Sequence, residues 1–402
     1  MFILVLLLFF TAFLFYGFIP GLGAFIIRSQ WYRFRQRLIN STHHPIAQPG
    51  LFSKNSLDGY LGEYRFFGKL ESIQGDNRLW ITDSTMTIGL DVEQLSLFLL
   101  RSYPVDVDKT NVEHFENTIP DDEPDYLPWK KIYSLPSGIR IFVAGHLYQE
   151  SGQFIFKQKE KEDLLIVIHD GKKQTLLKRS IWSGRHKNEY LNQFTPVSVA
   201  CGSLILLLIS YFLLQNPTMR FAAAASIMLS TFPISYLLPP GVFLYFLYRH
   251  FWKQARSLRS ERDLFLLPLR FFNKDEDFKK NEIYVHLPNG EEYGLIKWRP
   301  GAKNSSFTLN PEMKIRMTSL NQFLPEENVN YVFGIKDNTR LKESTDPMVE
   351  FVCIAGNPKE LAKQCNNKSK LLGITAALCI FTGIIINFFL IFFGINFFIF
   401  GP

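Results

Sequence analysis

Residues 197–214 read VSVACGSLILLLISYFLL and contain no charged side chain. About 20 apolar residues, each rising roughly 1.5 Å along a helix, are enough to cross the ~30 Å hydrocarbon core of a bilayer. This stretch is therefore expected to form a transmembrane helix. Three more segments of the same kind lie outward from it along the chain, and they are 1–27, 221–248 and 371–400. The sequence thus predicts four transmembrane helices.

The third of these segments, 221–248, contains prolines. Pro233 and the sequence Pro239-Pro240-Gly241 should break the helix, because proline lacks a backbone N–H and clashes with the preceding turn. The segment then either crosses the membrane with a kink or ends as a helix along the interface. Segment 1–27 is expected to remain as an anchor, since it has neither the basic start nor the small-x-small cleavage site of a signal peptide.

The composition indicates that folded polar parts accompany these helices. Phe contributes 39 of the 402 residues and the mean hydropathy is slightly positive, at +0.02. The 44 Lys and Arg and the 37 Asp and Glu lie almost entirely between the apolar segments. The four cysteines form no C-x-x-C pair, so we expect neither a disulfide framework nor a zinc ring. The histidines are dispersed apart from His43-His44, so no metal centre is expected, and no motif predicts a cofactor.

The basic residues predict the orientation. They flank the four expected helices on one side, whereas Arg220 stands alone on the other side. The positive-inside rule then places both large polar segments in the cytoplasm, most simply at a bacterial inner membrane. Segment 249–262 is expected to be a basic juxtamembrane helix that contacts anionic lipid, through Arg249, Lys253, Arg256 and Arg259. The net charge of +7 comes mainly from such flanks rather than from a basic, aromatic-studded stripe, so nucleic-acid binding is not expected.

The two polar segments carry strand signals. Short β-branched or aromatic runs such as 78–82 and 139–145 end at Gly, Asp, Asn or Pro, and 288–290 reads Pro-Asn-Gly, a hairpin signal. We expect a juxtamembrane linker over 28–59 and two small barrel-like β domains of OB type, over 60–192 and 263–366. The expected fold is therefore an α+β membrane protein.

The two β domains are expected to be an internal duplication. A constant shift of 205 residues matches Arg65 with Arg270, Phe66 with Phe271 and Gly89 with Gly294, and later 142–145 corresponds to 331–334. The first copy has an additional acidic stretch, which either is a solvated loop or binds a basic partner. Its carboxylates are Asp121, Asp122, Glu123 and Asp125.

Residues 79–92, an apolar strand followed by Asp83-Ser84-Thr85 and a second apolar strand, resemble the core of GIDE-type domains. Residues 136–145 are similar to the segment of that family in which Pro-x-Gly precedes a strand. This family comprises the β-rich, membrane-flanked module of mitochondrial ubiquitin ligase activators, and the resemblance covers about 60–215. It implies a membrane-flanked β domain. It does not imply ubiquitin ligation, because the chain lacks the C-terminal zinc ring, and Met86 stands where the family has Gly.

The expected function is a non-enzymatic scaffold or adaptor that holds two β domains at the membrane for a protein partner or a second copy of the chain. One alternative is a component of a transport or channel assembly, which the broken helix at 221–248 favours. Another is an enzyme whose site is assembled from distant residues. No residue is assigned a catalytic role, because His169-Asp170-Gly171 is explained as a strand-ending turn and no nucleophile motif accompanies it.

Overall fold

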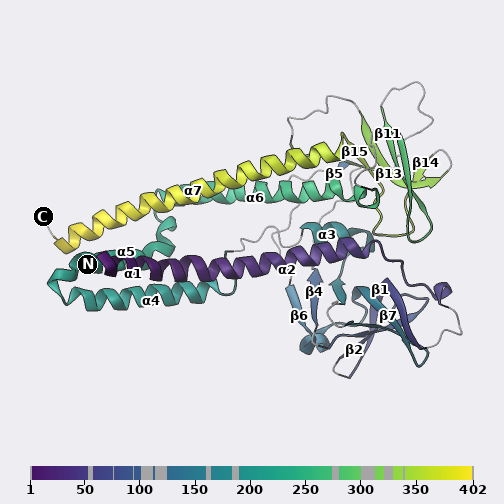
Figure 1. Ribbon diagram of the computed structural model, residues 1–402, viewed down its shortest axis with the longest axis horizontal. Helices are drawn as coiled ribbons and strands as arrows, with labels where there is room; N and C mark the ends of the chain where they lie inside the picture. The colour runs from purple at the N-terminus through teal and green to yellow at the C-terminus, as the bar shows by residue number, and fades with distance from the viewer. Residues whose placement is uncertain are drawn as a thin grey trace. The chain divides into compact units, whose positions relative to one another are not determined.

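The computed structural model describes residues 2–52, 58–75, 77–93, 95–100, 112–113, 125–159, 164–182, 190–273, 280–299, 313–320, 329–337 and 340–400. These residues form a mixed α/β protein of helices and two β-sheets (Figure 1). The chain divides into two compact units. The helical unit comprises Met1–Tyr32, Lys187–Arg259 and Asn366–Pro402, and the sheet unit comprises Arg33–His186 and Ser260–Cys365.

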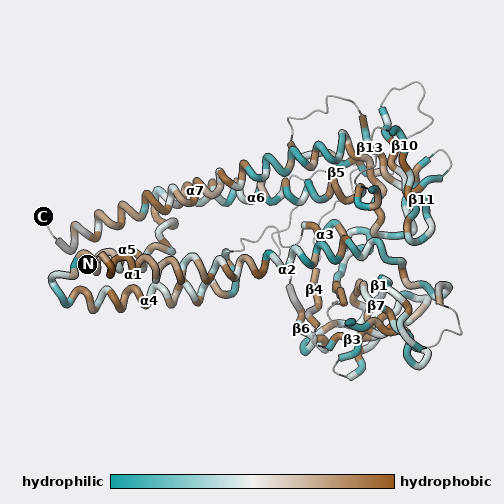
Figure 2. The backbone as a smooth tube through the Cα atoms, viewed as in Figure 1, coloured by the Kyte–Doolittle hydropathy of each residue, from teal (hydrophilic) through white to brown (hydrophobic). Residues whose placement is uncertain are grey.

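The α-helices are α1 (Phe2–Phe13), α2 (Ile19–Ser41), α3 (Leu176–Trp182), α4 (Thr195–Leu214), α5 (Arg220–Thr231), α6 (Gly241–Leu266) and α7 (Pro358–Phe400). The uncharged runs of the sequence are largely helical, but α2, α6 and α7 extend beyond them into charged sequence, and α3 lies outside them. A π-helical turn, η1 (Leu14–Phe18), joins α1 to α2. Within the described residues, three helical stretches are long and apolar enough to cross a membrane, namely Phe2–Ser41, Thr195–Leu214 and Pro358–Ile395. Figure 2 shows the hydrophobic residues along α1 and α4.

The expected third span is interrupted where the prolines predict. Segment 221–248 is divided among α5, a 3₁₀ stretch η7 (Phe232–Leu237) and the start of α6. Asn387 of α7 lies against this break. It is 1% exposed, and its side-chain amide donates to the carbonyl oxygens of Ser235 at 2.6 Å and Leu238 at 2.8 Å. This polar side chain thus faces another segment of the chain; the side chain of Asn396 lies outside the described residues.

Small residues allow close packing inside the helical unit. Ala222, Ala223, Ala224 and Ala225 are all buried in α5. The π turn also shifts backbone carbonyls toward neighbouring side chains, since Phe15 O accepts from Ser198 Oγ at 2.6 Å and Tyr16 O accepts from the Tyr190 hydroxyl. The contact between η1 and α4 therefore combines a hydrogen bond from the Ser198 side chain to a backbone carbonyl with close approach of the two helices.

Gly202 is the tightest point of that contact. A Cβ there would lie 2.6 Å from Phe15 Cβ and 2.9 Å from Tyr16 Cε1, so Gly202→Ala is expected to destabilise the packing by about 1–3 kcal/mol. Gly21→Ala is the matched control, because no atom lies within 4 Å of a Cβ at Gly21 and both variants gain the same helix propensity. Thermal unfolding in detergent should show a lower midpoint for Gly202→Ala alone. Equal midpoints for the two variants would contradict the packing.

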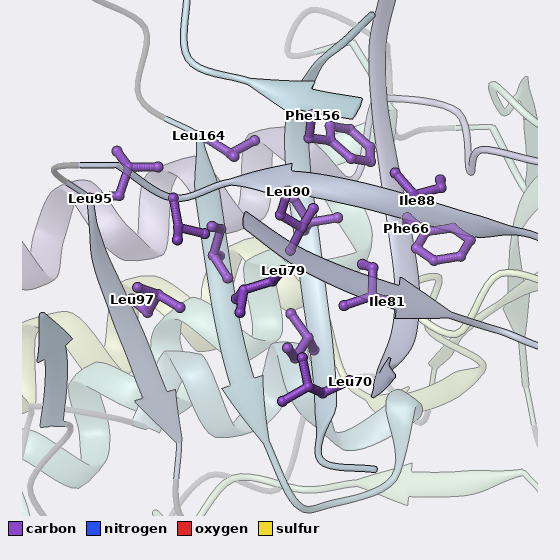
Figure 3. Close-up of a cluster of buried hydrophobic side chains, with 14 of the residues drawn as sticks. Phe66, Leu70, Leu79, Ile81, Ile88, Leu90, Leu95, Leu97, Phe156 and Leu164 are labelled. Atoms are coloured by element: carbon purple, nitrogen blue, oxygen red, sulfur yellow. The ribbon is translucent and has the colours of Figure 1, made fainter. Parts of the chain in front are cut away.

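The first sheet takes its strands from the first polar segment. They are β1 (Gly59–Gln74), β2 (Arg78–Thr82), β3 (Thr87–Asp91), β4 (Ser96–Leu100), β6 (Asp125–Pro128), β7 (Arg140–Glu150), β8 (Gln153–Lys157) and β9 (Leu165–His169), in the order β1-β2-β3-β8-β7-β9-β4-β6. β1 also pairs with β7, and β3 pairs in parallel with β8. Its alternate apolar residues meet in one core, and ten of them are labelled in Figure 3: Phe66, Leu70, Leu79, Ile81, Ile88, Leu90, Leu95, Leu97, Phe156 and Leu164.

The second sheet contains β10 (Glu282–His286), β11 (Glu292–Trp298), β12 (Lys314–Arg316), β13 (Asn330–Asp337), β14 (Arg340–Lys342) and β15 (Val352–Ala355). Their order is β10-β11-β13-β15-β12, and β14 pairs with β13. A short strand from the first polar segment, β5 (Val112–Glu113), extends this sheet by pairing in parallel with β12. The second sheet therefore includes backbone from both polar segments.

The two sheets share a pairing pattern at their C-terminal ends. β7 pairs antiparallel with β9, which pairs in parallel with β4, and β13, β15 and β12 repeat this arrangement. The β2–β3 and β10–β11 hairpins pair with different neighbours. β3 pairs with β8 in the first sheet, whereas β11 pairs with β13 in the second. Trp80 pairs with Gly89 and Tyr284 pairs with Gly294, so Tyr284 corresponds to Trp80, whereas the constant shift of 205 residues would align Trp80 with Val285.

Two features of the structure bear on the expected domain organisation. Residues 28–41, expected as part of a linker, continue α2 as helix up to Ser41. The two β segments, expected as separate domains, both belong to the sheet unit. The contacts that join them there define the candidate site.

Candidate functional site

Five charged side chains from both polar segments meet inside the sheet unit, and we call them the ionic junction: Arg65, Arg270, Arg316, Asp346 and Glu350. Both carboxylates come from the loop between β14 and β15, residues 343–351. Arg65 is 1% exposed, Arg316 is fully buried and Asp346 is 3% exposed. Charged groups so far from water are stable only when they are paired and hydrogen-bonded.

Arg65 links the first sheet to this loop. It lies on β1 in the run Tyr64-Arg65-Phe66-Phe67, and its guanidinium donates to both carboxylate oxygens of Asp346, with an NH1–Oδ1 distance of 3.0 Å. Its Nε also donates to the His44 carbonyl at 2.8 Å. The carboxylate of Asp346 accepts a further bond from the Met348 backbone N–H at 2.9 Å. The pair is therefore bidentate and fixed on both sides.

Arg270 makes a second link between the segments. Its Nε donates to Thr42 Oγ1 at 2.9 Å, and its two terminal nitrogens donate to the carbonyls of Leu267 at 2.8 Å and Met348 at 2.7 Å. Burial lowers the pKa of Arg270 to about 10, and the nearby carboxylates of Glu350 and Asp346 oppose that shift. The guanidinium is still charged at neutral pH.

Arg316 and Glu350 form the part of the junction that lies within the second segment. Arg316 donates to the two carboxylate oxygens of Glu350 at 3.2 Å and 2.8 Å, and also to the Leu264 carbonyl at 2.8 Å. The buried Tyr293 hydroxyl donates to the Glu350 carbonyl at 2.9 Å. Burial, followed by the charge of Glu350, raises the pKa of Tyr293, so the hydroxyl remains protonated and keeps its donor role.

Hydrogen bonds to Glu291 hold the loop that carries the two carboxylates, residues 343–351. The Glu291 carboxylate accepts bonds from Ser344 Oγ, from the Thr345 backbone N–H at 3.2 Å and from Thr345 Oγ1 at 2.9 Å. Although burial alone would raise its pKa, the hydrogen bonds from Ser344, Asn289 and Thr345 lower the pKa of Glu291. The charged carboxylate therefore holds the loop in place from the β10–β11 turn.

Residues 42–47 pass between the two arginines that join the segments. The Thr42 side chain accepts from Arg270, the ring of His43 lies edge-on to Phe271 at 5.4 Å, and Ala47 N donates to the Arg65 carbonyl at 2.8 Å. Burial, with Arg270 and Arg65 nearby, lowers the pKa of His43. His44 faces the Glu63 carboxylate at 2.9 Å, and burial nevertheless lowers its pKa as well.

No family model, curated protein or solved structure matches this chain. Function is therefore inferred from the geometry of the chain. Within the described residues, no group of three or more His, Cys, Asp or Glu side chains is arranged to hold a metal ion. The ionic junction instead resembles the interior of a rigid protein contact, because its donors and acceptors are directed at one another.

The residues singled out from the sequence lie elsewhere. Arg249 and Lys253 are exposed on α6, whereas Arg256 is 2% exposed with its guanidinium 4.7 Å from the ring centroid of Trp252, and Arg259 Nε donates to Ser369 Oγ at 3.0 Å. The four cations therefore do not share one exposed face. Asp121, Asp122 and Glu123 lie outside the described residues; Asp125 begins β6, and its side chain lies outside them too.

Sequence reasoning found only part of the junction. Arg65 and Arg270 were noted as matching positions of the repeat, but Arg316, Asp346 and Glu350 were not singled out. One local signal was available for Arg65, because an arginine inside an aromatic strand must either point to solvent or find a buried partner. No comparable signal marks Asp346, which lies in a polar loop.

Proposed function

We propose that this chain is a membrane-anchored, non-enzymatic scaffold whose two β segments act as one rigid body that binds a protein partner. The observation that carries the proposal is the ionic junction, in which Arg65 and Arg270 each bond across the two polar segments. A buried bidentate pair fixes register and orientation more than it adds stability. Two sheets held in this way present a surface of constant shape, which is what a binding platform requires.

Finer features of the fold belong to the same proposal. We assign the first sheet to the OB-like type; the pairings of β1 with both β2 and β7, and the parallel pairing of β3 with β8, support this assignment. The shared pattern of β7, β9 and β4 with β13, β15 and β12 supports an internal duplication. The resemblance to GIDE-type domains is kept as a proposal for the first β segment.

The membrane arrangement is proposed from charge. We assign a fourth crossing to the broken segment α5–η7–α6, since both of its flanks then obey the positive-inside rule, with Arg220 alone on the outer side. Both polar segments then face the cytoplasm of a bacterial inner membrane. The partner is a protein or a second copy of this chain, and nucleic acid is not proposed.

The test is co-purification of the full chain from its native membrane in mild detergent, with the mass of the complex measured by native mass spectrometry. A stoichiometric protein partner, or a defined homo-oligomer, is the expected result. Arg65→Ala should release the partner while the chain stays in the membrane fraction, because the two sheets would no longer be held in one orientation.

Arg78→Ala is the matched control, since Arg78 lies on neighbouring β2 and is not one of the five residues of the ionic junction. It should retain the partner. A monomer without partner in wild type would overturn the proposal, and so would a partner that binds equally to wild type and to Arg65→Ala.

A further inference from the structure

Exposed cations from two different helices gather where α6 and α7 change from polar to apolar sequence. On α6 these are Arg249, which directly follows the apolar run that ends at Tyr248, and Lys253, about one helical turn later. On α7 they are Lys368 and Lys370, which directly precede the apolar run that begins at Leu371. All four side chains belong to the helical unit. We call them the cation belt.

The two helices are fixed to each other at this level. Ser369 Oγ donates to the Ala255 carbonyl at 2.8 Å, and Arg259 donates to Ser369 at 3.0 Å. Farther along, a Cβ at Gly383 would lie 3.3 Å from Leu244 Cβ. Sequence numbers thus rise along α7 while they fall along α6, so the helices are antiparallel, as Figure 1 also shows.

This packing sets the depth of each cation. Lys370 follows the contact residue Ser369 directly, and Lys253 is two residues from its contact partner Ala255, so both lie within about 3 Å of the same level at 1.5 Å per residue. Arg249 lies about 6 Å farther toward the apolar ends of the helices, on the same face as Lys253. Its long side chain can reach back to the polar level, as interfacial arginines do.

Aromatic rings accompany the cations on α6. Tyr245 stacks on Tyr248 at 6.1 Å, and Tyr248 stacks on Trp252 at 5.9 Å. Tyrosine and tryptophan are enriched where membrane meets water, because one end of each ring is apolar and the other is polar. The rings and the cation belt therefore mark the same headgroup level.

We infer that the cation belt, Arg249 and Lys253 of α6 with Lys368 and Lys370 of α7, binds the phosphates of anionic phospholipid headgroups. Arg259, by contrast, bonds to Ser369 of α7, and Arg256 is buried with its guanidinium over Trp252 of its own helix. The opposite charge and the headgroup depth of the cations favour a lipid over free phosphate. A lipid headgroup is held at the level of the aromatic rings by its bilayer, whereas free phosphate has no preference for that level. The inference rests on the membrane location but not on the binding of a protein partner.

The experiment places the full chain in nanodiscs of mixed zwitterionic and anionic phospholipid and measures the lipids retained after extraction by native mass spectrometry. Wild type should retain anionic lipid above its share in the disc. The variant Arg249→Gln, Lys253→Gln, Lys368→Gln, Lys370→Gln should lose that enrichment by about fivefold or more, because each juxtamembrane cation contributes on the order of a fivefold preference. Arg256→Gln with Arg259→Gln should keep the enrichment and lower the thermal midpoint.

A matched control removes four exposed lysines of the sheet unit, Lys69, Lys130, Lys131 and Lys172, each to Gln. It should keep the enrichment. An equal loss of anionic-lipid enrichment in this control would show that net charge alone causes the enrichment, and would overturn the inference. Loss of the retained lipid on adding excess inorganic phosphate, or no enrichment in wild type, would overturn it too. Enrichment with no bound protein partner would leave the lipid site intact while the scaffold proposal fails.

Discussion

Arg65→Ala is expected to lower the free energy of unfolding of the sheet unit by about 3–5 kcal/mol, because it leaves the Asp346 carboxylate buried without its cation. The His44 carbonyl also loses a donor. Thermal unfolding of the full chain in detergent, followed by tryptophan fluorescence, measures the effect. The midpoint should fall by several degrees.

Two further variants show that the effect comes from the pair. The double variant Arg65→Met, Asp346→Leu removes both charges and should recover most of the lost stability, because a buried ion pair contributes little beyond the penalty of breaking it. Arg78→Ala, which removes a less buried arginine from the adjacent strand, should change the stability by less than about 0.5 kcal/mol. A loss in Arg65→Ala no larger than in Arg78→Ala would contradict the buried pairing.

Acidification from pH 7 to pH 4 is expected to destabilise the first sheet through His169. This residue ends β9, is 1% exposed and contacts the Gly171 carbonyl at 3.1 Å through Nδ1. Burial, with the charge of Arg179 close by, lowers the pKa of His169 from 6.5 to about 4. Between pH 6.5 and pH 4 the imidazole therefore takes up a proton in the unfolded chain but not in the folded chain. The free energy of unfolding falls as the pH drops below 6.5, by about 3 kcal/mol near pH 4.

The measurement is the thermal midpoint of the full chain at several pH values between 7.5 and 4. His169→Gln should lower the midpoint at neutral pH yet flatten its dependence on pH, because the titrating group is gone. His286→Gln is the control, since His286 is an exposed histidine at the end of β10 and its loss should leave the slope unchanged. The same slope in wild type and His169→Gln would refute the assignment.

Local signals were sufficient for the helices and many strands. The uncharged runs predicted the three long apolar helices, and Pro233 with Pro239 predicted the break after α5. The run at 78–82 coincides with β2, since alternation and flanking turn residues are properties of a few neighbouring residues.

Contacts between distant residues left no such signal. Arg65 and Asp346 are 281 residues apart, and nothing near either of them indicates the other. The pairing of β5 with β12 likewise depends on two short segments from different parts of the chain. The basic stripe on α6 was only partly right, because helical spacing places Arg249, Lys253 and Arg256 on one face but does not reveal that α7 covers part of it.

The hydrogen bonds of the Asn387 amide also have a consequence for synthesis, because they join segments that are made at different times. The amide donates to the carbonyl oxygens of Ser235 and Leu238, which precede it by 152 and 149 residues. Those carbonyls leave the ribosome long before their donor exists, and in the membrane crossing proposed for this segment hydrocarbon would supply no substitute for it. In that arrangement the broken segment lacks its donor until the last helix has been made. Truncation ahead of residue 387 would leave every earlier helix made but the bundle unfinished.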